Sequence, residues 1–146
     1  MVDPFDLFIF FRVNMYIDGI KMLPKTITSS GHLATDFKEL FSSEEAREAK
    51  GVVYFFMSEK PIPRVRGESN ILYIGKTSQS LHKRYFRYCN KLASRASGKF
   101  YEYIVKNYGG ISLGYLVSDN PKVMEAEYFK KYHKAYLEYP PKSKVG

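Results

Sequence analysis

The sequence predicts an α+β fold: a small three-stranded antiparallel sheet flanked by helices in the order β-β-α-α-β-α, preceded by an N-terminal extension. Runs of β-branched and aromatic residues at 51–57, 70–75 and 111–117 predict the strands, and segments of helical periodicity follow the second and third runs. At 146 residues the chain is long enough for one ordinary domain with its own core. We therefore divide it into an extension, 1–50, packed on a main domain, 51–146.

Two short elements are expected in the extension. The first part is rich in strand formers, and Asp18-Gly19 between two apolar triplets is typical of a β-hairpin turn. A loop over 24–33 precedes a short acidic helix that is predicted from about residue 35 by its apolar spacing. Ser42 followed three residues later by Glu45 forms a capping-box pattern, which could start another helical turn.

Glycine and proline mark the breaks between elements of the main domain. Gly109-Gly110 ends a helical segment, and Asn120-Pro121 supplies an N-cap and a first-turn proline for the last helix. In order, we expect a strand over 51–57, a loop over 58–69, a strand over 70–75, helices over about 80–96 and 99–108, a strand over 111–117, a helix from 120 to about 136, and a mobile tail over 140–144.

Positive charge is concentrated in the main domain. The net charge is −2 over residues 1–50 (6 basic against 8 acidic) and +10 over residues 51–146 (17 against 7). Basic and aromatic residues alternate in Lys83-Arg84-Tyr85-Phe86-Arg87-Tyr88, which suits a partner rich in phosphate. An ordinary basic surface explains the charge equally well, so composition alone leaves both interpretations open.

Cysteine usage and hydropathy argue against several other classes of protein. Cys89 is the one cysteine, so no intramolecular disulfide or thiolate metal cage can form, and a packing role inside a helix is favoured for it. The apolar run from 7 to 11 is far below the roughly 18 residues that span a bilayer, and acidic Asp3 and Asp6 precede it. We expect an intracellular protein of the cytoplasm, nucleoid or nucleus, with no membrane partner.

The pentapeptide Tyr73-Ile74-Gly75-Lys76-Thr77 is the most informative segment. Its last three residues resemble the end of a phosphate-binding P-loop, but that loop needs a glycine five positions before Gly75, where the chain has Asn70. The residues before the lysine are β-branched and aromatic, which predicts a strand rather than a flexible loop. Arg84 follows on the next predicted helix.

Four features occur in a fixed order along the main domain. Gly51-Val52-Val53-Tyr54 lies on the first predicted strand, Tyr73-Ile74-Gly75 on the second, Arg84 on the following helix and Glu125 on the last helix. In this order the chain resembles the GIY-YIG nuclease family over about residues 51–137. The resemblance implies a divalent-metal-dependent endonuclease that hydrolyses phosphodiester bonds of double- or single-stranded DNA, with Mg²⁺ or Mn²⁺ as cofactor. A homodimer is left open.

The resemblance places two tyrosines at the attacking water. Tyr73 and Gly75 share one face of their strand, where a glycine leaves room for a phosphate to approach. On the first strand the family pattern points to Val53, but its neighbour Tyr54 carries the phenol, and the two cannot face the same side without a bulge. Core packing is the alternative role for each tyrosine. Lys76 matches a position that is often basic in the family and is expected to help the phenol act as a base.

The resemblance assigns the phosphate and the metal to helical residues. Arg84 is expected to bind the scissile phosphate with its forked guanidinium, and Tyr88, one turn later, matches a position near that phosphate. Glu125 and Glu127 compete for the metal, and the family pattern of apolar residues three and four positions later selects Glu125. A single carboxylate with waters and phosphate oxygens suits Mg²⁺ or Mn²⁺.

Further basic residues are expected to contact the nucleic acid backbone, with plain surface charge as the alternative. Three lie on the helix after the motif and two in the long loop before it: Lys83, Arg87, Lys91, Arg64 and Arg66.

Two departures from the family pattern keep other functions open. The first motif is degenerate, and Leu137 stands where family members usually carry an asparagine. A catalytically impaired nucleic-acid-binding module on the same scaffold is therefore the second hypothesis. An adaptor that binds a protein partner through the first 50 residues is the third.

Overall fold

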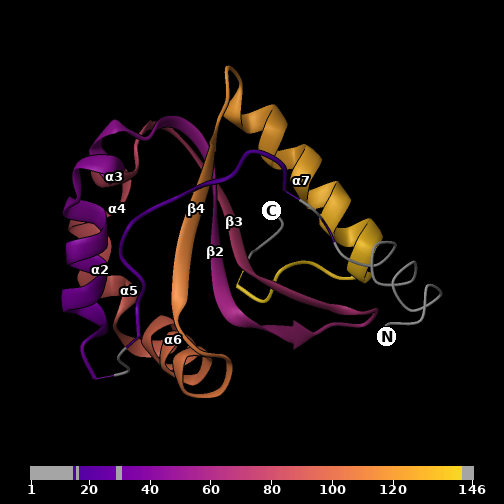
Figure 1. Ribbon diagram of the computed structural model, residues 1–146, viewed down its shortest axis with the longest axis horizontal. Coiled ribbons are helices and arrows are strands. Elements are labelled where there is room, and N and C mark those ends of the chain that lie inside the picture. The colour runs from indigo at the N-terminus through magenta and orange to yellow at the C-terminus, as the bar shows by residue number, and fades with distance from the viewer. Residues whose placement is uncertain (1–14, 16, 29–30, 143–146) are drawn as a thin grey trace, which may run out of the picture.

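A four-stranded antiparallel sheet packed against helices forms the fold in the computed structural model, which describes residue 15, residues 17–28 and residues 31–142 (Figure 1). The predicted α+β class is confirmed, but the sheet has a fourth strand and the order β1-β4-β2-β3. In chain order the elements are β1 (Lys21–Met22), α2 (Leu33–Ser42), α3 (Glu44–Glu48), β2 (Lys50–Pro63), β3 (Glu68–Ser80), α4 (Leu81–Tyr85), the 3₁₀ helix η1 (Phe86–Tyr88), α5 (Cys89–Leu92), α6 (Arg95–Tyr108), β4 (Ile111–Val117) and α7 (Pro121–Tyr136).

The central hairpin of β2 and β3 is much longer than the sequence predicted. The expected loop over 58–69 is wrong, because β2 continues to Pro63, β3 begins at Glu68, and Ile62 pairs with Ser69. Pairing between β2 and β4 ends at Ser58, so Pro61 and Pro63 lie where β2 has an open edge and needs no donor. Prolines that we took for a loop are thus tolerated in a strand.

A bulge at Leu72 sets the direction of the side chains on β3. Phe56 pairs with Tyr73 and the next residue of β2, Met57, pairs with Ile71, which leaves Leu72 as the unpaired extra residue. Ile71 and Ile74 pack in one hydrophobic cluster, whereas Leu72 packs in the cluster on the opposite face, with Tyr73 against it. The bulge therefore directs two consecutive side chains to the same face.

The long helix expected over 80–96 is broken into three short pieces. Ser80 caps α4 by accepting a hydrogen bond from the Lys83 N–H, and the chain tightens into η1 before α5 begins. Tyr85 and Cys89 are both buried, so tertiary packing fixes this turn more strongly than helix propensity does. The other two predictions, α6 ending at Gly109 and α7 with its Asn120 cap, are confirmed.

The described part of the extension contributes to the same sheet and core. Asp18-Gly19 forms the predicted turn, but β1 after it pairs with β4, and the other expected arm lies largely outside the described residues. Phe37 and Phe41 of α2 are fully buried. Ser42 is the last residue of α2 and not a cap, which corrects the sequence prediction; Ser43 caps α3 instead, by accepting from the Ala46 N–H.

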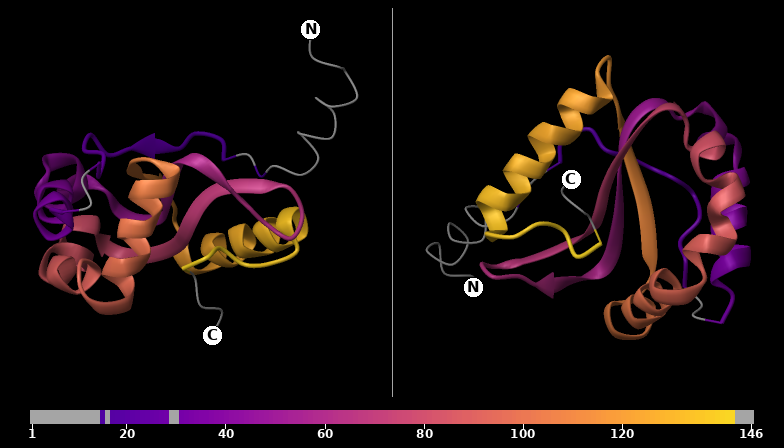
Figure 2. Two further views of the ribbon diagram at one scale, coloured as in Figure 1. Left: turned by 90° about the horizontal axis from the view of Figure 1, so that it is seen from below. Right: turned by 180° about the vertical axis from the view of Figure 1, so that it is seen from behind.

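The β2–β3 hairpin separates two hydrophobic clusters. Helices α2 to α6 lie on one side of it and α7 lies on the other (Figures 1 and 2). The aromatic face, on the α2–α6 side, buries Tyr54, Phe56, Tyr85 and Tyr101 with Phe37 and other residues. The aliphatic face, on the α7 side, buries a second set: Val53, Phe55, Ile71, Ile74, Tyr132 and Tyr136. Within the described residues, no helix has the length and hydropathy to cross a membrane.

Candidate functional site

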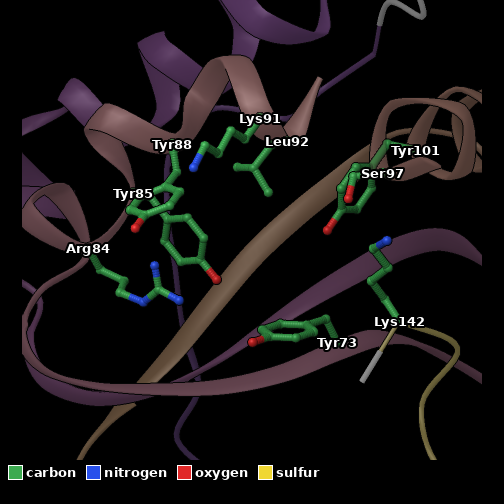
Figure 3. A pocket seen from close by; sticks show the side chains of 9 residues that line it. All are labelled: Tyr73, Arg84, Tyr85, Tyr88, Lys91, Leu92, Ser97, Tyr101 and Lys142. Atoms are coloured by element: carbon green, nitrogen blue, oxygen red, sulfur yellow. The ribbon is translucent and has the colours of Figure 1, made fainter. Parts of the chain in front are cut away.

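A cavity of about 270 Å³ opens on the aromatic face, between β3 and the helical segment from α4 to α6 (Figure 3). Three of its lining side chains are cationic, Arg84, Lys91 and Lys142, and none is a carboxylate. The remaining lining residues are mostly aromatic: Tyr73, Tyr85, Tyr88, Leu92, Ser97 and Tyr101. A cationic cavity with aromatic walls suits a phosphate attached to an organic group.

Tyr54 lies beside Tyr73, and the register of β2 with β3 is regular from Val52 to Phe56, so no bulge is needed to bring it there. It pairs with Gly75 on β3, and the Tyr54 and Tyr73 ring centroids are 6.0 Å apart. Val53 packs on the aliphatic face, whereas Val52 and Tyr54 pack on the aromatic face, so Tyr54 is the residue of the first motif that brings a phenol there. The pairing of the two tyrosines that the sequence suggested is thus present in the geometry.

Gly75 makes room for the Tyr54 ring. A Cβ atom at position 75 would lie 2.4 Å from Cζ and 2.5 Å from Oη of Tyr54, far inside van der Waals contact. The space beside Gly75 is therefore filled by a phenol, which corrects the expectation that it stays open for a phosphate. Glycine is required at position 75 because any larger side chain would overlap the Tyr54 ring on the paired strand.

Tyr54 is buried and its hydroxyl bonds to another phenol. The Tyr54 and Tyr85 hydroxyl oxygens lie 2.7 Å apart, and Tyr54 is 1% exposed. Burial raises the pKa of both phenols well above the ordinary value of tyrosine, with the neighbouring phenols adding to the effect at Tyr54. Tyr54 is therefore held neutral and supports the cavity from behind, whereas half-buried Tyr73 lines it directly.

Arg84 reaches the cavity from α4 and stacks on two tyrosines. Its guanidinium carbon lies 4.9 Å from the Tyr85 ring centroid and 5.4 Å from that of Tyr88. Lys91 places its ammonium 5.0 Å from the Tyr88 centroid. Within the described part of the chain, none of the recorded ion pairs involves Arg84 or Lys91. Both cations are therefore oriented by aromatic rings and lack a carboxylate that would compete with an anionic ligand.

Glu125 lies apart from this cavity. It is half-buried on α7, which packs against the aliphatic face, and burial raises the pKa of its carboxyl while Lys76 opposes that shift. Lys76 is two residues after Ile74 of that face and is exposed. Glu127 is exposed as well. The geometry brings Glu125 and Lys76 near each other and leaves both outside the cavity lining.

A divalent metal would find one protein carboxylate at Glu125. No group of three His, Cys, Asp or Glu side chains that could hold a metal occurs among the residues described. A protein-only metal cage does not fit the described residues, whereas Mg²⁺ or Mn²⁺ bound through one carboxylate, with waters and substrate phosphate oxygens as the other ligands, does fit them.

Two of the arginines that were expected to bind nucleic acid serve the fold. Arg64 forms an ion pair with Glu138 at 2.5 Å and donates to the Tyr139 carbonyl, and Arg66 donates to the carbonyls of Lys134 and Ala135. They attach the tip of the β2–β3 hairpin to the C-terminal end of α7. These contacts leave little of either guanidinium for a substrate strand.

The expected backbone contacts on α4, η1 and α5 divide between two places. Lys91 lines the cavity, but Lys83 and Arg87 are exposed around a separate hollow that also includes Gln79, His82 and Phe86. Helical spacing accounts for this division: Arg84, Tyr88 and Lys91 are four and three residues apart and face the cavity, whereas Lys83 and Arg87 are four apart on the neighbouring face.

The sequence analysis missed five residues of the cavity lining: Tyr85, Leu92, Ser97, Tyr101 and Lys142. Tyr85 and Tyr101 are ordinary aromatic residues of helical segments, and only their partners in space show that they border the site. Lys142 falls in the tail that we expected to be mobile, yet its N–H donates to the Leu72 carbonyl at 2.9 Å. The adjacency of Tyr85 to Arg84 was the one available signal.

Comparisons with known proteins gave no match: no family profile, curated protein or solved structure corresponds to this chain.

Proposed function

We propose that this protein is a metal-dependent endonuclease that hydrolyses DNA phosphodiester bonds through a GIY-YIG-type site. The observation that carries the proposal is the meeting of Tyr73 and Arg84 in one cationic cavity, with Tyr54 packed directly behind them. The fold supports the proposal, because Tyr54 and Tyr73 lie on the two strands of one hairpin, Arg84 on the helix after it and Glu125 on the helix after β4, in the order that the resemblance implies.

Arg84 binds the scissile phosphate in this proposal. A guanidinium stays charged at all working pH values and donates to two phosphate oxygens at once. Its two stacked tyrosines fix its direction, so little reorganisation is needed when charge develops on the phosphate. Lys91 adds a second cation at the same wall of the cavity.

Tyr73 orients the attacking water, and Tyr54 positions Tyr73. The Tyr73 side chain lines the cavity and can reach a water beside the phosphate, whereas the phenol of Tyr54 is buried and occupied by Tyr85. This distribution departs from our expectation that both tyrosines act directly at the water. It assigns Tyr54 and Tyr85 to maintaining the geometry.

Glu125 is the proposed metal ligand. β3 is an edge strand, so a substrate strand crossing that edge can meet Arg84 on one face and Glu125 on the other. A divalent ion bound there supplies Lewis-acid stabilisation of the charged phosphate and of the departing oxygen. Lys76 beside Glu125 then neutralises further phosphate charge at the same edge.

A second candidate function is a nucleic-acid-binding module without catalysis. It is favoured by one observation, that Glu125 does not line the cavity of Tyr73 and Arg84. The third hypothesis, an adaptor acting through the extension, gains no support from α2, because Phe37 and Phe41 are buried in the core instead of being displayed to a partner.

A cleavage assay separates these functions. Supercoiled plasmid and labelled single- and double-stranded oligonucleotides are incubated with the protein in Mg²⁺, Mn²⁺ or EDTA, and Glu125→Ala is compared with Glu127→Ala as its exposed neighbour. The nuclease proposal predicts metal-dependent cutting that Glu125→Ala abolishes and Glu127→Ala leaves within about threefold. Binding without cutting under every metal condition would establish the second candidate, and neither binding nor cutting would reject both.

A further inference from the structure

The segment after α7 brings Lys142 into the cavity from the side opposite α4. The Lys142 N–H donates to the carbonyl of Leu72, the bulged residue of the edge strand β3. A bulged residue on an edge has a main-chain acceptor that no neighbouring strand uses. This single backbone bond therefore fixes the position at which the lysine side chain enters the site.

The Lys142 side chain is oriented toward the cavity and is not paired with an acid. Its ammonium lies 5.6 Å from the Phe100 ring centroid, and the recorded ion pairs of the described residues do not include it. Figure 3 shows Lys142 and Arg84 at opposite ends of the cavity, with Tyr73 and Tyr88 between them. Cations at both ends of an aromatic cavity suit a ligand with anionic ends and a flat middle.

The size and lining of the cavity further restrict which ligand can bind. A volume of about 270 Å³ is close to the lower end of the ~300–1,000 Å³ range of small-molecule sites, which leaves room for about one nucleotide. Tyr88 lies between the cations of Arg84 and Lys91 and is 45% exposed, so part of its ring is open to a base. A paired and stacked base in a duplex cannot enter such a cavity without leaving the helix.

We propose that this cavity is a subsite for one unpaired nucleotide of the DNA substrate, with the phosphate at one end on Arg84, the phosphate at the other end on Lys142, and the base against Tyr88. The assignment of Arg84 to the phosphate that is cut rests on the proposed nuclease function, but binding of the nucleotide does not. The preferred substrate is consequently DNA with a gap, bulge or unpaired strand.

Binding is tested in EDTA, where cutting is absent. Fluorescence anisotropy follows a labelled oligothymidylate of about eight nucleotides, a length within the usual site sizes of single-strand-binding folds, across a range of salt concentrations. Lys142→Ala is compared with Lys106→Ala, which removes the same charge from an exposed site on α6. We expect Lys142→Ala to weaken binding about three- to tenfold and to reduce the slope of log K against log salt by about 0.7, the value for one lost single-strand phosphate contact.

The proposed contact of the base with Tyr88 is tested with a second pair of variants. Tyr88→Leu should weaken binding about tenfold, whereas Tyr103→Leu, at another exposed tyrosine, should leave it within about twofold. A continuous duplex of the same length should bind more weakly than the unpaired strand, and a duplex with one unpaired nucleotide should be cut faster than the continuous duplex.

The outcomes separate this inference from the nuclease proposal. Equal salt slopes for Lys142→Ala and Lys106→Ala, or equal binding of duplex and unpaired strand, would overturn the subsite whether or not the protein cuts DNA. A Lys142-dependent slope and a Tyr88 effect in a protein that cuts no DNA would establish the subsite and reject the nuclease.

Discussion

The two faces of the β2–β3 hairpin both bury a hydrophobic cluster but differ in what they leave open. On the aliphatic face, Val53, Phe55 and Ile74 pack directly against α7. On the aromatic face, Tyr54, Tyr73 and Tyr85 pack with rings tilted or edge-on, and a cavity with three cations remains beside them.

This difference shows how one small sheet can support a packed hydrophobic core and a ligand cavity at the same time. Tyrosines fill space while keeping a hydroxyl that must find a partner, and the aliphatic face buries two of them, Tyr132 and Tyr136, beside its aliphatic side chains. The buried Tyr54–Tyr85 pair satisfies two such hydroxyls and thereby holds Tyr73 and Arg84 at the rim. The aromatic face is thus expected to be the one where substitutions change chemistry as well as stability.

The largest effect is expected at Arg84. If the aromatic face carries the reaction, Arg84→Ala lowers the cleavage rate about 10³-fold, because removing one oriented donor to a developing charge has this scale of effect. Arg87→Ala is the control, since Arg87 is exposed on η1 outside the cavity. Single-turnover cleavage and thermal melting are measured for both. Equal cleavage rates for the two variants at unchanged melting temperatures would show that the reaction does not take place at the aromatic face.

The second largest effect is expected at Gly75 of β3, which lies against the ring of Tyr54 on β2. Gly75→Ala forces the Tyr54 ring out of a site in which the new Cβ would be 2.4 Å away, and we expect a loss of about 1–3 kcal/mol in the free energy of unfolding together with reduced cleavage. Gly31→Ala is the matched control, because its Cβ would meet nothing within 4 Å. Urea denaturation measures both variants. A Gly75→Ala protein as stable as Gly31→Ala would show that the ring moves freely.

A loss of stability in the same range, but without crowding of the Tyr54 ring, is expected when one hydroxyl of the buried pair is removed. Tyr85→Phe leaves the Tyr54 hydroxyl without its 2.7 Å partner, which costs about 1–3 kcal/mol in the free energy of unfolding. The double variant Tyr54→Phe/Tyr85→Phe removes both groups and should recover part of that loss. Additive losses in a double-mutant cycle would mean that the two hydroxyls do not interact. Tyr103→Phe, at an exposed phenol, controls for the substitution itself.

The sequence predicted local features of the fold well and the long-range ones poorly. Alternation lets only one of Val53 and Tyr54 face the site, and the phenol was the reason to prefer Tyr54; Asn120-Pro121 correctly marked the start of α7. The course of β2 beyond Ser58 was missed, because prolines usually end a strand and only the absence of a neighbour on that edge permits them.

The sequence predicted the part of the site that lies in or near the Tyr73–Thr77 motif, but not the residues that reach it from elsewhere in the chain. Tyr73 and Arg84 share a short segment, so their meeting follows from one strand and one helix. Lys142 reaches them through a bond to a bulged residue 70 positions earlier, and a bulge has no reliable signature in a single sequence. The role given to Gly75 was mistaken for a related reason, since only the register shows which ring lies opposite it.

The smallest effect is expected far from the cavity, at the hairpin tip, and it tests whether Arg64 belongs to the fold or to a substrate path. Arg64→Met removes the ion pair with Glu138 and the bond to the Tyr139 carbonyl, which should lower the free energy of unfolding by about 1 kcal/mol. Lys60→Met, at an exposed position of the same hairpin, should change it by less than about 0.5 kcal/mol.

The decisive measurement for Arg64 is the salt dependence of oligonucleotide binding. A residue whose guanidinium is already bound to α7 contacts no phosphate, so the slope of Arg64→Met should equal that of the unsubstituted protein, in contrast to Lys142→Ala. A slope reduced by about 0.7 would instead show that DNA displaces Glu138 from Arg64. The hairpin tip would then be a second binding surface, and the division of roles between the two faces would no longer hold.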